Sequence, residues 1–226
     1  RDTAARLLFE RKDNAAIPLL AGQLARSRDP LARLHSLYAL RGLEALTEKD
    51  VLAATGDSDV RVREHGVRLA ATLIQDGNIP DALWQRLAAL SADRSPWVRM
   101  ELAFTVGNIE RDSTAAFLAN IARNSVGDRA VQFAVLSSAA DRAHDLFSEL
   151  VMNPYFSSTP QGWDLVSELA ELTGAENSSG MDDALLTIQD AELSELESFT
   201  LASRLGEGLS AGGQNFASAA PGGKDR

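Results

Sequence analysis

Two histidines occupy the same place in a repeated pattern: His35 stands two residues after Arg33, and His65 stands two residues after Arg63. The next copy of the pattern has Glu101 at that place, so stacked copies would set out a His–His–Glu column. Imidazole and carboxylate groups are zinc ligands, but a site needs three or four of them in one place. The alternative is that this position tolerates polar side chains where repeats pack. We expect the alternative, and no bound metal or other cofactor.

Other side chains suggest chemistry only weakly. Trp84, Trp97 and Trp163, together with the many aspartates, could form a base-capture site of the kind found in DNA glycosylases built on helical repeats. A DNA-binding surface is strongly basic, whereas this chain of 226 residues has a formal net charge of −10. We therefore expect no nucleic-acid partner, and we expect the three tryptophans to pack between helices.

Paired carboxylates are also present, at Asp182-Asp183 and Glu195-Glu197. General acid–base catalysis needs a pocket that separates two pKa values, and adjacent residues on a helix point apart. The chain has no cysteine, so thiolate zinc sites, iron–sulfur clusters, covalently attached haem and cysteine nucleophiles are excluded. No phosphate-binding glycine loop or nucleophile elbow occurs either. We expect this segment not to be an enzyme.

Charge is distributed unevenly along the chain. Residues 1–111 carry 16 Lys or Arg and 15 Asp or Glu, whereas residues 112–226 carry 6 and 17. Between Arg142 and Arg204 there is no basic residue. Carboxylates at this density either repel one another in solvent or face positive charge supplied by a partner. No apolar run is long enough for a membrane span, so we expect no direct membrane insertion.

The sequence contains a repeated helical pattern. An N-cap type residue stands four positions before an arginine in Asp29-Pro-Leu-Ala-Arg33, Asp59-Val-Arg-Val-Arg63 and Ser95-Pro-Trp-Val-Arg99. Asp29 and Ser95 are expected to accept hydrogen bonds from free amides at their helix starts. Apolar residues at helical spacing follow each start. A second set of helices is predicted between the first, at 13–26, 47–55, 79–92 and 112–124, and further helices at 142–152, 160–173, 181–189 and 192–208.

The strings ATGDSDVRVREHGVRLAATL and LSADRSPWVRMELAFTVGNI resemble HEAT repeats of the short, bilin-lyase type. Helical spacing without convincing strand alternation predicts an all-α fold. Together with the resemblance it implies a right-handed α-solenoid of HEAT-like helical hairpins. The resemblance also implies a ladder in which the turn aspartate of one repeat pairs with the helix arginine of its neighbour. The residues at the matching positions are Asp57, Arg33, Arg63, Asp93 and Arg99.

The ladder is expected to weaken at both ends of this region. Ser27 stands where the first turn aspartate would be, and Gln132 replaces the arginine in the last clear copy. We expect HEAT-like repeats over 1–140, degenerate acidic helices continuing the solenoid over 141–209, and a flexible tail or linker over 210–226.

A narrower resemblance covers RDTAARLLFERKD, DPLARLHSLYALRGL and LVSELAELTGAENS, which are similar to the helical-repeat region of large planctomycete-type membrane-bound dehydrogenase and haem-binding proteins. In that family a sugar-dehydrogenase-like β-propeller precedes the repeats and a CxxCH haem segment follows. The resemblance implies an excised middle of a redox protein, periplasmic or membrane-associated; without it, a cytoplasmic location is expected.

These expectations favour a non-catalytic scaffold that binds a protein partner or a neighbouring domain of the same parent chain. Two alternatives remain open at this point. One is an accessory segment of a multidomain, membrane-associated dehydrogenase-like protein. The other is chromophore handling of the bilin-lyase kind.

Overall fold

The computed structural model describes residue 7 and residues 9–176 and 180–212. Within these residues the protein is all-α, and the only extended pairing is an isolated bridge between Gln75 and Asn78. No helix in the described part is long and apolar enough to cross a membrane. The chain forms two compact units, Arg1–Glu110 and Arg111–Arg226. The boundary between them falls before the sequence-based boundary at residue 140.

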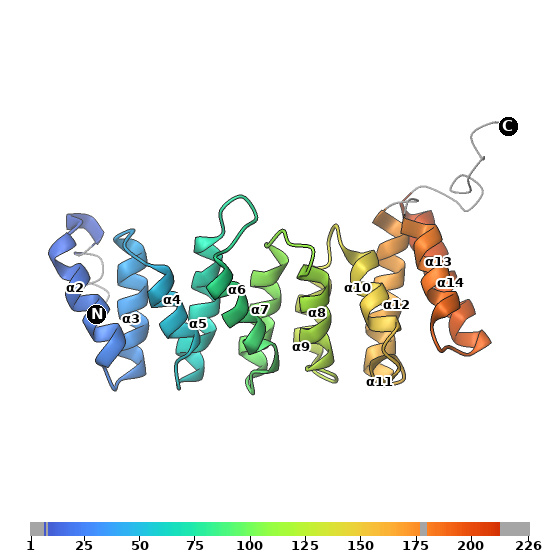
Figure 1. Ribbon diagram of the computed structural model, residues 1–226, viewed down its shortest axis with the longest axis horizontal. Helices are drawn as coiled ribbons and strands as arrows, with labels where there is room; N and C mark the ends of the chain where they lie inside the picture. Colours follow the sequence, from blue (N-terminus) through green and yellow to red (C-terminus); the bar gives the residue numbers. More distant parts are fainter. Residues whose placement is uncertain (1–6, 8, 177–179, 213–226) are drawn as a thin grey trace. The chain divides into compact units, whose positions relative to one another are not determined.

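The first unit is built from helical hairpins (Figure 1). Its elements are η1 (Asn14–Ala16), α2 (Ile17–Arg26), α3 (Pro30–Gly42), α4 (Glu48–Thr55), α5 (Val60–Ala70), η2 (Ala71–Leu73), α6 (Asp81–Ala89), η3 (Leu90–Ala92) and α7 (Pro96–Gly107). Helix α2 packs on α3, α4 packs on α5, and α7 packs on η3, the 3-10 turn that extends α6. Successive hairpins also touch, since α3 contacts α5, α5 contacts α7, and α4 contacts both α2 and α6.

Local sequence explains where three of these helices begin. The carboxylates of Asp29 and Asp59 accept from backbone amides in the first turns of α3 and α5, as N-caps do. Thr47 and Asp50 form a complete capping box at the start of α4. Ser95 departs from the expectation, because its side chain makes no capping hydrogen bond; its own amide is instead bound by the carboxylate of Asp93 at 2.9 Å.

The second unit contains α8 (Thr114–Arg123), α9 (Arg129–Ser137), α10 (Ala143–Val151), α11 (Pro154–Ser157), α12 (Pro160–Glu176), α13 (Met181–Asp190) and α14 (Glu195–Ala211). Helix α8 packs on α9 and α10, and α10 packs on α12 and α13. Helix α12 also contacts α9, and its most extensive contact is with α14. Part of the expected tail is helical, because Ser210 and Ala211 end α14; residues 213–226 lie outside the described residues.

Two glycines bring α12 and α14 together. A Cβ atom placed on Gly174 would overlap the carbonyl oxygen of Leu205, and one placed on Gly208 would overlap the carbonyl oxygen of Glu171. Both glycines are buried, and each faces backbone rather than a movable side chain. The two helices therefore approach at a distance that no other residue type at these positions permits.

Aliphatic side chains make up most of the core in both units. The largest fully buried residues include Leu37, Leu40, Leu69, Leu83, Leu87, Leu102, Ile109, Leu118, Ile121, Leu146, Phe147 and Leu150. Trp97 was expected to pack between helices, but it is 52% exposed. Its ring instead lies beside the guanidinium of Arg61, 5.8 Å from centroid to Cζ, in a cation–π contact between α7 and α5.

Candidate functional site

Arginine–aspartate pairs join successive hairpins of the first unit. Nε and Nη2 of Arg33 both lie 2.6 Å from the carboxylate oxygens of Asp57. One repeat further on, the same atoms of Arg63 bind the carboxylate of Asp93 at 2.8 and 3.1 Å. Both pairs are largely buried, with side-chain exposures between 7% and 18%. Such two-point contacts are stronger and more directional than single ion pairs.

The same arginines also donate a hydrogen bond to the backbone of their own repeat. In each case Nη1 donates to the backbone carbonyl six residues earlier. The bonds run from Arg33 to Ser27 at 2.8 Å, from Arg63 to Asp57 at 2.9 Å, and from Arg99 to Asp93 at 2.5 Å. Three successive repeats thus share one local geometry, including the one in which Ser27 replaces the aspartate.

The paired aspartates are held in their ionised form. Burial alone would raise the pKa of Asp57, but hydrogen bonds from Arg33 and from the Asp59 amide outweigh burial and lower that pKa. The pKa of Asp93 is lowered in the same way by Arg63 and the Ser95 amide. A carboxylate with a depressed folded-state pKa stabilises the fold above its unfolded pKa, and that contribution is lost as pH falls through the folded value.

The lowered pKa values of these aspartates predict how acid affects the arginine–aspartate ladder. We expect Asp93→Asn to lower the free energy of unfolding at pH 7, and the gap to wild type to shrink below about pH 4, where aspartates begin to protonate. Urea melts between pH 7 and pH 2.5 measure both curves. Asp112→Asn, at an exposed aspartate, is the matched control. A gap that stays constant over the whole pH range would contradict the stabilising role of the Asp93 carboxylate.

The histidine column is not assembled in the described residues. Nδ1 of His65 is hydrogen-bonded to the hydroxyl of Tyr38 at 2.7 Å, and the two rings meet edge to face. Burial, with a smaller effect of Arg68, lowers the pKa of His65. Glu101 receives two hydrogen bonds from Arg68, at 3.1 and 2.6 Å. The described residues include no group of three or more His, Asp or Glu side chains that could hold a metal ion.

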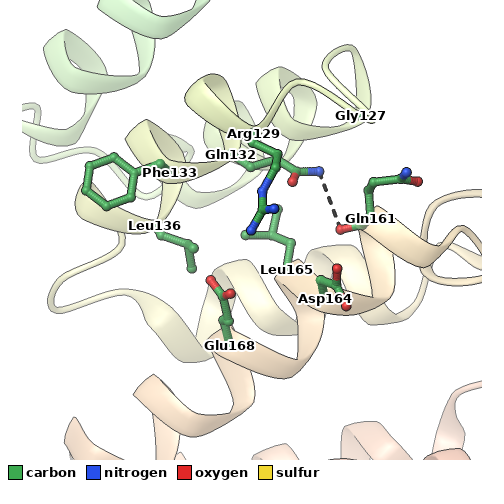
Figure 2. Close-up of a pocket in the computed structure, with 9 residues that line it drawn as sticks. All are labelled: Gly127, Arg129, Gln132, Phe133, Leu136, Gln161, Asp164, Leu165 and Glu168. Carbon is green, nitrogen blue, oxygen red and sulfur yellow. Dashed lines mark hydrogen bonds between the residues drawn. The ribbon is translucent and has the colours of Figure 1, made fainter.

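A groove lies in the second unit, where the ladder residue is Gln132 instead of arginine. The side-chain amide of Gln132 donates to the backbone carbonyl of Gln161 at 3.4 Å and bridges α9 and α12 (Figure 2). Beside this bond the two helices leave a groove of about 450 Å³. A volume of this size accommodates several side chains of a bound segment.

Charges of both signs line the groove, as Figure 2 shows. Arg129 extends from α9 toward α12, while Asp164 and Glu168 project from α12 one helical turn apart. These three side chains are exposed and make no ion pair or side-chain hydrogen bond with any described residue. Phe133, one turn after Arg129 on α9, is 66% exposed at the rim. The site therefore presents unpaired charge next to apolar surface.

The lining groups can bind a peptide segment. Leu136 and Leu165 supply apolar surface, and the amides of Gln132 and Gln161 can bond to peptide groups. A guanidinium pairs with carboxylates, and the carboxylates opposite it accept from lysine or arginine. Sequence reasoning flagged only Gln132. Arg129 and Phe133 are four residues apart, as are Asp164 and Glu168, so the sequence could have placed each pair on one face of its helix. It could not have shown that α9 and α12 face each other.

Comparisons with known proteins identify no relative. No protein-family model matches the chain, and neither curated proteins nor solved structures give a match. The resemblances to HEAT repeats and to dehydrogenase-associated repeats therefore stay predictions.

Proposed function

We propose that this chain is a non-catalytic scaffold, a right-handed α-solenoid of HEAT-like hairpins, that binds a protein segment in the groove between α9 and α12. The partner is another protein or a neighbouring domain of the same parent chain, and neither nucleic acid nor a membrane interior is a partner. Repeat proteins of this class work by offering extended surfaces rather than closed pockets.

Packing within each unit supports the solenoid. In the first unit α3, α5 and α7 contact one another in order, and α2, α4 and α6 do the same, which is how stacked hairpins pack. The arginine–aspartate pairs link each hairpin to the next. In the second unit α10 packs on α8, α12 and α13, so stacking beyond one hairpin occurs there as well.

The observation that carries the binding function is the exposed Phe133 beside unpaired charges of both signs. Arg129, Asp164 and Glu168 form no ion pair with one another or with any other described residue. A bound segment with one acidic and one basic side chain would pair with all three, and an apolar side chain would cover Phe133. Aromatic residues and arginines are the commonest energetic centres of protein interfaces.

Site-specific crosslinking tests this proposal. We expect benzoylphenylalanine at the position of Phe133 to form protein adducts in an extract of the source cells. The adduct yield should fall by about fivefold or more when Asp164→Asn and Glu168→Gln are added, because the bound cation then loses its partners. The control carries the same crosslinker at Leu19, an exposed apolar residue of the first unit. Equal adducts at both positions, or adducts indifferent to the two carboxylates, would reject the groove.

A further inference from the structure

A second surface lies at the tip of the α13–α14 hairpin, apart from the groove. Leu186 is 57% exposed one turn before α13 ends, while Leu196 and Phe199 are 75% and 73% exposed in the first turns of α14. Only residues 191–194 separate the two helices, so all three side chains lie near the same end of the hairpin. We call Leu186, Leu196 and Phe199, with the carboxylates of Asp190, Glu192 and Glu195 beside them, the hairpin tip.

The exposed side chains of the tip belong to helix faces that no other part of the described chain covers. Helix α13 buries Met181, Ala184 and Ile188, and α14 buries Leu201, Leu205 and Leu209. At 100° per residue, Leu196 and Phe199 fall on the side of α14 opposite those buried positions. Isolated exposed leucines are ordinary, but three large apolar side chains at one tip are typical of an interaction surface.

Hydrogen bonds order the start of α14 at the tip. Ser194 and Glu197 form a capping box at the start of α14: the Glu197 carboxylate accepts from the amide and hydroxyl of Ser194 at 2.8 and 2.6 Å. These hydrogen bonds lower the pKa of Glu197, so the carboxylate stays ionised at neutral pH. A surface that is already ordered loses less conformational entropy when it binds.

The charge of the segment around the hairpin tip indicates which kind of partner would bind there. The segment from Met181 to Ala211 contains seven carboxylates and one arginine, Arg204. Arg204 already has carboxylate partners within the chain, because its Nη1 lies 3.2 Å from Oε2 of Glu171 and 3.1 Å from Oε2 of Glu207. A second copy of the chain would bring the same acidic residues together, because a two-fold contact uses one patch on both subunits. The apolar centre with an acidic rim fits a basic counterpart instead.

We propose that the hairpin tip binds a basic amphipathic helix of a partner protein. Such a helix would place leucine or phenylalanine side chains at spacings of three and four residues against Leu186, Leu196 and Phe199. Its lysines and arginines would face Asp190, Glu192 and Glu195. In recognition of an amphipathic helix, apolar anchors supply affinity and the surrounding charges supply rate and selectivity.

The probe is a dye-labelled 18-residue peptide of leucine and lysine at helical spacing, titrated with the full chain by fluorescence anisotropy. A scrambled peptide of the same composition, without an apolar face, is the matched ligand control. We expect the amphipathic peptide to bind at least about tenfold more tightly than the scrambled one. Raising the salt from 0.05 M to 0.5 M should weaken binding by about fivefold, since exposed charges are screened beyond roughly 10 Å at 0.1 M.

Substitutions show whether the peptide binds at the hairpin tip or in the groove between α9 and α12. Leu196→Ala with Phe199→Ala should raise Kd by about tenfold or more, and Glu192→Gln with Glu195→Gln should reduce the salt dependence. Alanine preserves helix propensity at these exposed sites, so folding is maintained. Leu19→Ala and Phe133→Ala should each leave Kd within about twofold. Circular dichroism checks that every variant keeps its helical content.

The outcomes are decisive in either direction. The tip assignment is overturned if wild type does not bind, if the scrambled peptide binds equally well, or if the Leu196–Phe199 variant retains its affinity. If Phe133→Ala abolishes binding instead, the peptide binds in the groove between α9 and α12. That result would reject the tip as its site and support only the function proposed above. Concentration-dependent dimerisation that disappears in the Leu196–Phe199 variant would identify a second copy as the occupant and also reject the proposal.

Discussion

Alanine at Gly208 is expected to destabilise the protein by about 2–4 kcal/mol, a large effect for the addition of one methyl group. The new Cβ would overlap the carbonyl oxygen of Glu171 on α12, and that oxygen is backbone, so it cannot rotate away. Gly174→Ala should cost a similar amount, because its Cβ would overlap the carbonyl oxygen of Leu205 on α14. Each substitution forces the two most extensively packed helices of the second unit apart.

Urea melts followed by circular dichroism measure these losses. Gly22→Ala is the matched control inside α2, because its Cβ would meet only the terminal nitrogen of Arg26, a flexible group that can move. There the better helix propensity of alanine, worth up to about 1 kcal/mol, should leave stability unchanged or improved. The double variant Gly174→Ala/Gly208→Ala should cost less than the two single losses together, since the helices are already separated. Equal small effects at all three glycines would refute the close approach.

Removing Arg63 is expected to have the second large effect. Arg63→Ala leaves the carboxylate of Asp93, only 7% exposed, without its two-point partner, and it also removes the bond to the Asp57 carbonyl. A buried charge that loses its counter-ion costs about 2–4 kcal/mol. Arg99→Ala should fall in the same range by the ladder prediction, since its Nη1 holds the Asp93 carbonyl.

The controls are arginines outside the ladder. Arg94 is exposed, and Arg61 pairs with Glu64 while its own side chain is 60% exposed, so replacing either by alanine should cost less than about 1 kcal/mol. The double variant Arg63→Ala/Asp93→Ala should cost less than the separate losses added, because the second change removes the stranded charge. Small and equal losses at Arg61, Arg63, Arg94 and Arg99 in urea melts would mean that the ladder does not stabilise the fold.

Much of this molecule follows from local sequence. Apolar spacing and start signals such as Asp29 predicted the all-α class and helices within a few residues of those observed, because caps and periodicity act within one or two turns. The resemblance to HEAT repeats implied that Arg63 pairs with the aspartate of the next turn, and the two side chains do form this pair. The replacement at Gln132 marked where that pattern stops.

Other features required the tertiary structure, because they depend on which faces meet across long stretches of chain. Nothing within α7 indicates that Trp97 is half exposed beside Arg61, or that the Ser95 side chain is not a cap. Tyr38 binds Nδ1 of His65 because α3 and α5 pack together, and Glu101 binds Arg68 because α5 and α7 pack together.

The candidate surfaces show the same division. The sequence placed Asp164 and Glu168 on the predicted helix 160–173 and predicted an acidic second half. Packing of α9 near α12 decided that Asp164 and Glu168 line one groove with Arg129 and Phe133. Packing of α14 on α12 decided which side of α14 stays exposed. Helix formation is governed by neighbours along the chain, whereas a groove is defined by side chains that approach from different helices, and only the folded chain brings those together.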